Sequence, residues 1–267
     1  MIYRIDHFKE TNINPITQKE YDDSWIVYIL NNEPYRMFVG STDGCAYTLK
    51  VSKNVSYWEM TLGDFISYNN SIGKNMILVI SKDDYQKAMK KYKGHAHNER
   101  YLREYEEPIL IHSTTKENYE NIIKDGCLKS WNQLRKERND TEKEPIGKQL
   151  GDPVELRDFI LFGNGTTGEI VVNSKQSNRI LMDENMKYKT GARLYFDVKK
   201  IAEDGLIIRD GSEIKVKDTL PLKPYLLWAA TWDNVGLSSE ISTPKIFAQT
   251  ADQYFQDNII GSKISFL

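Results

Sequence analysis

The sequence has little cysteine and no long apolar stretch, and these two absences exclude several classes of protein. Its 267 residues contain two cysteines, Cys45 and Cys127. Two thiols cannot build the disulfide framework of a small secreted domain, so we expect both to be reduced and buried. A membrane-spanning helix needs about 20 consecutive apolar residues, whereas a typical apolar run here is as short as Met76–Ile80. We therefore expect no membrane association.

Neither acidic nor basic residues are in large excess. The chain carries 36 basic and 38 acidic residues, which gives a formal net charge of -2. This balance excludes a strongly basic nucleic-acid coat protein, but it is compatible with a local basic groove, because binding depends on the local field. The first residues, Met1 to Asp6, lack the apolar core of a signal peptide, and we expect a cytoplasmic protein. The 16 tyrosines fit either a flat binding groove or ordinary sheet faces.

The alternation of apolar segments and turn signals predicts an α+β protein with two domains. The polar and charged segment 94–107 indicates a boundary near residue 105. We therefore expect a smaller N-terminal α+β domain over residues 1–105, which binds the target or regulates the site. Residues 106–267 form the second domain.

Four short apolar segments of the first domain are expected to be strands, and the first two are expected to form a hairpin: residues 26–30, 35–39, 46–51 and 76–80. Ser81 and Asp84 have the spacing of a helix N-terminal cap. Gly94 is expected to end that helix.

The second domain begins with an expected strand at 108–112. Thr114 and Glu117 have the spacing of a capping box for a helix over 116–125, and Gly126 is its expected left-handed cap. Asp210-Gly211 predicts a hairpin turn. The other elements that we expect are strands at 159–162, 169–173, 194–198, 206–209 and 213–217, and a helix at 244–256.

The most informative motif begins at His112, at the end of the predicted strand. Thr114 and Asn118 follow it at the start of the predicted helix. A histidine in this position can bond a sugar hydroxyl, and the free N–H groups at a helix N-terminus suit a diphosphate. The same residues also fit a simpler interpretation, in which a backbone carbonyl holds the histidine and Thr114 only caps the helix.

This pattern resembles the first strand and helix of the ADP-ribosyltransferase superfamily. The spacing is most like that of the DarT-like DNA ADP-ribosyltransferase toxins, and it is also similar to the RNA 2′-phosphotransferases of the KptA group. The resemblance implies a split β-sheet in residues 106–267, NAD as co-substrate, and His112 as the residue that contacts the NAD ribose. Ser113, Thr114 and Asn118 would line the nucleotide.

Later segments resemble the same family in the same order. Residues 157–161 are similar to its third strand, and residues 192–198 are similar to the strand of its strand–helix–glycine unit. Residues 212–216 are similar to its last catalytic strand, which a glutamate opens in the DarT-like toxins. The resemblance therefore implies that Glu213 is the catalytic acid. Glu169 is the alternative acid, because residues 169–172 resemble the glutamate-bearing strand of the poly(ADP-ribose) polymerase branch.

The chemistry that the family carries out needs few side chains. Breaking the bond between nicotinamide and ribose develops positive charge on the sugar, which a carboxylate stabilises. An aromatic ring stacks on nicotinamide, and a guanidinium can meet the diphosphate through a bidentate contact. The candidates for the ring are Tyr119, Phe162 and Tyr195, and those for the guanidinium are Arg157 and Arg193. Core packing and solvated arginines are the simpler alternatives.

The leading hypothesis is an NAD-dependent mono-ADP-ribosyltransferase that modifies DNA, RNA or a protein. By family resemblance the setting is a toxin or phage-conflict effector, with an antitoxin or regulatory partner. One alternative is an RNA 2′-phosphotransferase that uses NAD, although Glu213-Ile214 stands where that group has Asn-Gly-Val. A non-catalytic module that binds a nucleotide or a partner is the other alternative.

Two further patterns are weaker. Gly163, Gly165 and Gly168 have the spacing of a dinucleotide fingerprint, but we expect this loop to join strand to strand, and that fingerprint joins strand to helix. His95 and His97 resemble half of a metal site, but no further ligand completes it. We therefore expect neither a Rossmann domain nor a bound metal.

Overall fold

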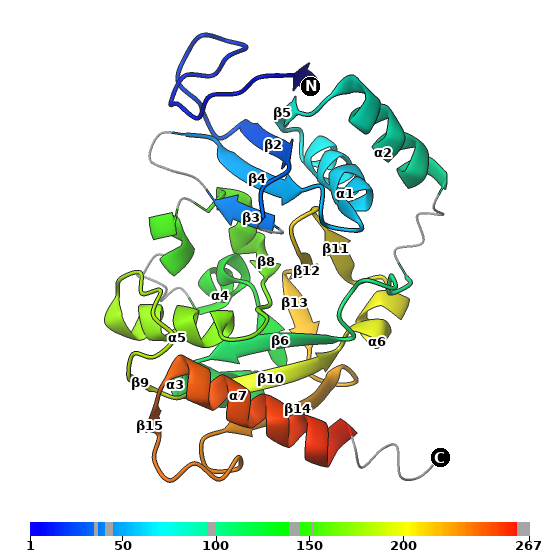
Figure 1. Ribbon diagram of the computed structural model, residues 1–267. Coiled ribbons are helices and arrows are strands. Elements are labelled where there is room, and N and C mark those ends of the chain that lie inside the picture. Colours follow the sequence, from blue (N-terminus) through cyan, green and yellow to red (C-terminus); the bar gives the residue numbers. More distant parts are fainter. Residues whose placement is uncertain (35–36, 41–44, 95–99, 139–144, 151, 261–267) are drawn as a thin grey trace. The chain divides into compact units, whose positions relative to one another are not determined.

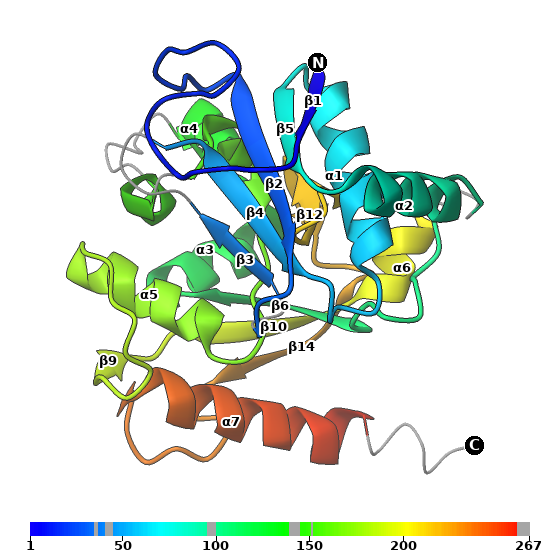
Figure 2. The ribbon, with the colours of Figure 1, turned by 45° about the horizontal axis from the view of Figure 1, so that its top comes forward.

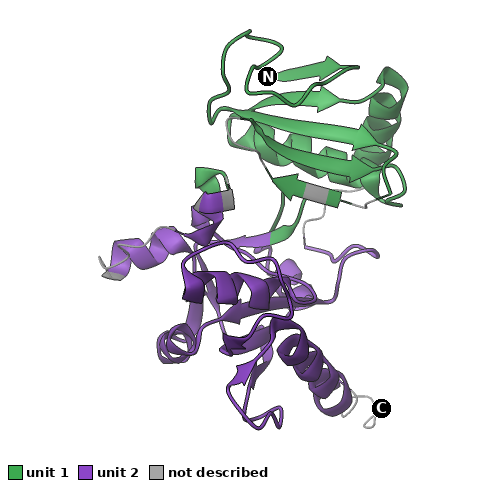
Figure 3. Ribbon diagram, turned by 60° about the vertical axis from the view of Figure 1, so that its left-hand side comes forward, with its two compact units in different colours: residues 1–98, 150–156, 208–214 green, residues 99–149, 157–207, 215–267 purple. Residues whose placement is uncertain are grey.

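The computed structural model describes residues 1–34, 37–40, 45–94, 100–138, 145–150 and 152–260. The protein divides into two compact units (Figure 3). Unit 1 comprises residues 1–98, 150–156 and 208–214, and unit 2 comprises residues 99–149, 157–207 and 215–267. Unit 1 therefore takes in two short segments that come from beyond residue 105.

Unit 1 is built on a five-stranded sheet in the order β1-β5-β2-β4-β3. The first four strands in this order are parallel, and β3 runs antiparallel to β4 at the edge. The strands are β1 (Ile2–Ile5), β2 (Trp25–Asn31), β3 (Met37–Gly40), β4 (Tyr47–Ser52) and β5 (Asn75–Val79).

The predicted hairpin between the first two apolar segments is wrong. The strand β2 is almost wholly apolar and buried, as is typical of a strand with parallel neighbours on both sides. Both of its edges are taken by β4 and β5. The strand β3 therefore pairs with β4 instead, with Met37 opposite Val51.

Two helices cover one face of this sheet, α1 (Trp58–Ser71) and α2 (Lys82–Gly94) (Figures 1 and 2). The other face packs against side chains of the long N-terminal loop, including Phe8, Ile16 and Tyr21. Ser81 caps α2 as expected, because its Oγ accepts the Asp84 N–H at 3.1 Å. The parallel sheet therefore has an apolar layer on each side.

Unit 2 contains a three-stranded antiparallel sheet in the order β14-β10-β6. These strands are β6 (Ile109–Thr114), β10 (Ala192–Asp197) and β14 (Leu226–Thr231). The helices α5 (Thr167–Ser177) and α7 (Pro244–Phe255) pack on one face through Val172, Phe247 and Phe255 (Figure 1). This sheet and its two helices position the candidate site.

The remaining elements are short. The hairpin of β11 (Ile207–Arg209) and β12 (Ile214–Lys217) turns at Asp210-Gly211 as expected, with Gly211 at φ 91°, and β12 pairs with β8 (Phe159–Ile160). Two further strand pairs are β7 (Cys127–Lys129) with β13 (Thr219–Pro221), and β9 (Tyr188–Lys189) with β15 (Ile241–Ser242). The other helices and helical turns are α3 (Lys116–Asp125), α4 (Trp131–Arg138), α6 (Val198–Glu203), η1 (Ile146–Leu150), η2 (Val154–Asp158) and η3 (Gln256–Ile260).

The protein is thus a mixed α+β protein, and several local expectations hold. Gly126 ends α3 in the left-handed conformation with φ 68°, and α7 lies where the C-terminal helix was expected. The cap of α3 is a correction, because Thr115 and not Thr114 accepts the Asn118 N–H. Both cysteines are half-buried, and neither forms a disulfide with a described residue. Within the described residues, no helix combines the length and apolarity needed to span a membrane.

Candidate functional site

His112 lies on β6 and is held in one tautomer. Its Nδ1 is 3.0 Å from the carbonyl oxygen of Leu161. A carbonyl oxygen only accepts, so Nδ1 carries the hydrogen and Nε2 of the neutral ring is an acceptor. Burial lowers the pKa of His112 to about 4, the bond to Leu161 opposes this shift, and the charge of Lys175 adds to it. At neutral pH the ring is therefore uncharged.

Nε2 of His112 and the hydroxyl of Thr114 have no hydrogen-bond partner in the part of the chain that the structure describes. The two side chains share a face of β6, because alternate residues of a strand point to the same side. Thr114 is 5% exposed. Gly191 lies so close to the backbone of Thr114 that a Cβ at position 191 would come within 1.7 Å of the Thr114 carbonyl oxygen. The two free polar atoms can thus meet one ligand.

The loop 161–168 runs along three consecutive residues of β6. The Gly163 N–H bonds the Ile111 carbonyl at 2.9 Å, and the Leu161 carbonyl holds His112. Gly168 lies on Ser113 so closely that a Cβ there would come within 2.4 Å of Ser113 Oγ. The loop is therefore fixed against the strand that carries His112.

Two expectations about this region were wrong. Residues 169–173 form part of the helix α5 and not a strand. The glycine-spaced loop consequently joins strand to helix, contrary to the expectation. A dinucleotide-binding domain also needs a parallel sheet, however, and β8 pairs antiparallel with β12. The fold around the loop therefore still differs from a Rossmann domain.

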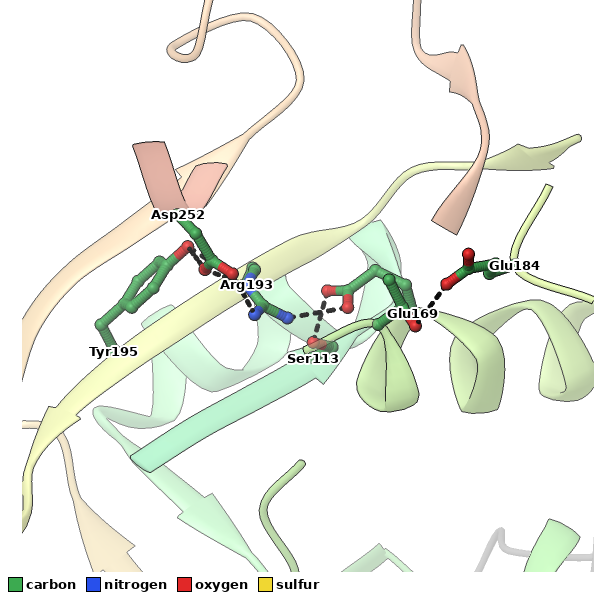
Figure 4. Close-up of polar contacts among 7 residues, drawn as sticks. Ser113, Glu169, Glu184, Arg193, Tyr195 and Asp252 are labelled. Carbon is green, nitrogen blue, oxygen red and sulfur yellow. Dashed lines mark hydrogen bonds and ion pairs between the residues drawn. The ribbon is translucent and has the colours of Figure 1, made fainter. Parts of the chain in front are cut away.

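Glu169 lies in the first turn of α5 and forms part of a buried chain of polar contacts (Figure 4). Ser113 Oγ donates to its Oε1 at 2.6 Å, and Arg193 Nη1 donates to its Oε2 at 2.7 Å. Burial raises the pKa of Glu169, while Arg193 and Ser113 act against that shift. Its side chain is 1% exposed, and that of Arg193 is 0% exposed.

Asp252 on α7 completes this chain. Arg193 binds it through Nε to Oδ1 and Nη2 to Oδ2, both at 2.9 Å. The Tyr195 hydroxyl donates to the same carboxylate at 2.8 Å. We call Ser113, Glu169, Arg193, Asp252 and Tyr195 the buried network; it joins β6, β10, α5 and α7 (Figure 4). Asp252 is its outer end, with a side chain that is 40% exposed.

The buried network corrects two candidate roles. Arg193 is enclosed and bonded to three side chains, so it does not face a diphosphate from solvent. Glu169 has both oxygens engaged, so this carboxylate is not free to stabilise a sugar cation. Tyr195 stacks on Phe255, with ring centroids 4.2 Å apart, and is a core residue.

The remaining candidates are dispersed. Phe162 contacts the His112 ring edge-on at 6.3 Å between centroids. Asn118 is exposed at the start of α3, and Tyr119 is half-buried beside it. The Arg157 guanidinium lies over the Trp131 ring at 5.4 Å.

Glu213 immediately precedes β12 and is half-buried. Its backbone N–H bonds Asp210 Oδ1 at 3.0 Å, which closes the hairpin turn. The segment 208–214 belongs to unit 1, whereas His112 belongs to unit 2.

The sequence interpretation missed Asp252 and Lys175. Asp252 is on the helix α7 among Ala248, Ala251 and Phe255, which are all buried. An acidic residue next to such an apolar stripe indicates a buried partner of opposite charge. Lys175 gave no sequence signal, because a lysine near the end of a helix is ordinary.

Comparisons with known proteins found no match among family models, curated proteins or solved structures. The described residues contain no group of three or more histidine, cysteine, aspartate or glutamate side chains that is arranged to hold a metal ion. His95 and His97 lie outside the described residues.

Proposed function

We propose that this protein is an NAD-dependent ADP-ribosyltransferase that transfers ADP-ribose to a nucleic acid or a protein. The supporting observation is the state of His112. Its Nδ1–H is bound to Leu161, and its ring is neutral, so Nε2 is an acceptor that lacks a partner among the described residues. Such a group selects a hydrogen-bond donor and not a phosphate oxygen. A ribose hydroxyl of NAD is a donor of this kind.

In this proposal the C–N bond between ribose and nicotinamide breaks, and its electron pair leaves with nicotinamide. A nucleophilic atom of the acceptor forms the new bond to the sugar carbon and loses its proton. By the family resemblance, Glu213 is the residue assigned to stabilise the sugar cation and to take that proton. His112 and Thr114 hold the ribose, Phe162 provides the aromatic surface beside them, and Ser113 acts only through the buried network.

The proposed setting follows from the resemblance of residues 108–228 to toxin enzymes. The acceptor is DNA, RNA or a protein, and a regulatory partner such as an antitoxin restrains the activity. A cytoplasmic site of action fits this role. Unit 1 then binds the acceptor or regulates the site.

The first test is calorimetric titration of the whole protein with NAD, together with an assay for released nicotinamide. We expect binding to the wild type and a loss of at least tenfold in affinity for His112→Ala, since one hydrogen bond and its packing are removed. Lys199→Ala is the matched control, because it removes only the exposed ion pair with Glu203 on α6. No binding to the wild type would overturn the proposal.

The second test separates binding from chemistry. Labelled NAD is incubated with DNA, RNA or protein, and Glu213→Gln is compared with Glu169→Gln. We expect Glu213→Gln to abolish labelling of the acceptor while NAD still binds. If NAD binds and no acceptor is labelled, the protein is a nucleotide-binding module. Release of a cyclic ADP-ribose phosphate from 2′-phosphorylated RNA would favour the phosphotransferase instead.

A further inference from the structure

The buried network has a feature that an ordinary structural ion pair does not need: it ends on the residue next to His112. Ser113 follows His112 on β6, and its hydroxyl bonds Glu169 at 2.6 Å. Arg193 lies opposite Ser113 on the neighbouring strand β10 and binds the other oxygen of Glu169. One carboxylate therefore ties the start of α5 to both strands.

The same carboxylate is placed at the end of the loop that orients His112. Glu169 comes directly after Gly168, which lies on Ser113. The other end of the loop holds the Nδ1 of His112 through the carbonyl of Leu161. If residue 169 moves away from β6, the loop loses its attachment at the Gly168 end. The bond from the Gly163 N–H to the Ile111 carbonyl remains, so the carbonyl of Leu161 is held less firmly.

The energetic character of such a pair supports a role in orientation. Taking two charges out of water offsets much of their attraction, so buried pairs are often no more stabilising than apolar residues of the same size. In some proteins, buried polar groups instead select one arrangement of their partners. Arg193 is itself held in one orientation, because Asp252 binds the other side of its guanidinium with two parallel bonds.

We propose that Glu169 and Arg193 are positioning residues, which hold the loop 161–168 on β6 and thereby fix the tautomer and orientation of His112. The ligand that His112 receives rests on the proposed function, but the positioning itself does not. It is a property of the free protein. Disrupting the pair should therefore change the His112 ring even when no nucleotide is present.

The decisive experiment is nitrogen NMR of the histidine rings in the whole protein across pH. The chain has four histidines, and the His112→Gln variant assigns the signal. In the wild type we expect a single Nδ1–H tautomer and a pKa of about 4. In Glu169→Gln and Ser113→Ala we expect a mixture of tautomers and a pKa at least one unit higher, because the freed loop lets water reach the ring.

Ser113→Ala keeps the experiment decisive if Glu169→Gln does not fold, since it removes the link to β6 and leaves the ion pair intact. Lys199→Ala is the control and should leave His112 unchanged, because its pair with Glu203 on α6 is exposed and does not involve the loop. Circular dichroism verifies that each variant is folded. Folded variants in which the tautomer and the pKa of His112 stay as in the wild type would overturn the proposal.

A second readout connects the positioning to the ligand. We expect Ser113→Ala to raise the dissociation constant for NAD about tenfold, while the turnover at saturating NAD changes less than twofold. If the wild type does not bind NAD, the proposed function fails, and the NMR result still decides whether the network positions His112. If NAD binds equally to wild type and Ser113→Ala, the positioning role fails alone.

Discussion

Each unit buries a glutamate, and the two glutamates are neutralised in different ways. In unit 1, Glu59 meets Lys87 at 3.1 Å and Lys91 at 3.0 Å, and these lysine side chains are 63% and 38% exposed. In unit 2, Glu169 meets Arg193, whose side chain is 0% exposed. Glu59 is thus neutralised by partly exposed lysine side chains, which approach it from the solvent side. Glu169 and Arg193 form a pair that is closed to solvent and lies next to the candidate site.

This difference indicates which of the two units needs polar groups in its interior. The parallel sheet of unit 1 is held by apolar layers on both faces, and its buried acid is placed at the start of α1. In unit 2 the polar chain passes between the sheet and its two helices. A charged interior of this kind is common at functional sites. Four predictions sharpen the comparison, from the largest effect to the smallest.

Replacing Arg193 by Met should give the largest effect. Glu169 would then be a buried charge without a cationic partner, and such a change costs about 3–5 kcal/mol of unfolding free energy. The double variant Glu169→Gln/Arg193→Met should recover part of that loss, since no uncompensated charge remains at position 169, and Asp252, whose side chain is 40% exposed, can be hydrated. Denaturant unfolding measures both. A loss below about 1 kcal/mol for the single variant would show that the pair is not closed to water.

Mild acid should weaken the protein through His112. The folded pKa of about 4 lies below the ordinary value of 6.5, so the unfolded chain binds the proton more readily. The contribution is complete above pH 6.5 and is lost as the pH falls from 6.5 to about 4. It amounts to at most about 3 kcal/mol. In His112→Gln this part of the pH dependence should disappear from unfolding curves recorded between pH 4 and 7.

Gly63→Ala tests the apolar packing of unit 1. An added Cβ would come within 2.1 Å of the Tyr92 ring, and overpacking of this kind costs about 1–3 kcal/mol. Gly94→Ala is the matched control, because nothing lies within 4 Å of its added Cβ. Thermal unfolding distinguishes them. Equal midpoints for the two variants would contradict the close contact between α1 and α2.

Lys91→Ala should have the smallest effect. The lysine is partly exposed, and Lys87 remains beside Glu59. Exposed pairs contribute about 0–1 kcal/mol, so the change in unfolding free energy should fall within that range. Addition of salt should reduce it further. A loss as large as that of Arg193→Met would show that the two glutamates are held in the same way.

Elements with strong local signals were predictable from the sequence. The cap at Ser81, the left-handed Gly126 and the turn at Asp210-Gly211 each depend on neighbouring residues, and each is present as expected. The motif around His112 also placed the histidine on a strand that a capped helix follows.

Features that depend on distant partners were not predictable. The helix α1 gave no amphipathic pattern, because residues 58–65 are buried without interruption. The short segment 169–173 is apolar enough for a strand, but it is the interior of α5. The partners of Glu169 are 24 and 56 residues away, and no local pattern in the chain announces such a pairing.

The placement of Arg193 opposite Ser113 also has a consequence for how the chain assembles. A slip of one residue between β6 and β10 would turn every side chain to the other face of the sheet. Arg193 would then point away from Glu169 and Asp252, with its charge enclosed on the wrong side. The misaligned sheet would thus be penalised while it forms. The ion pair thereby selects one alignment of these two strands.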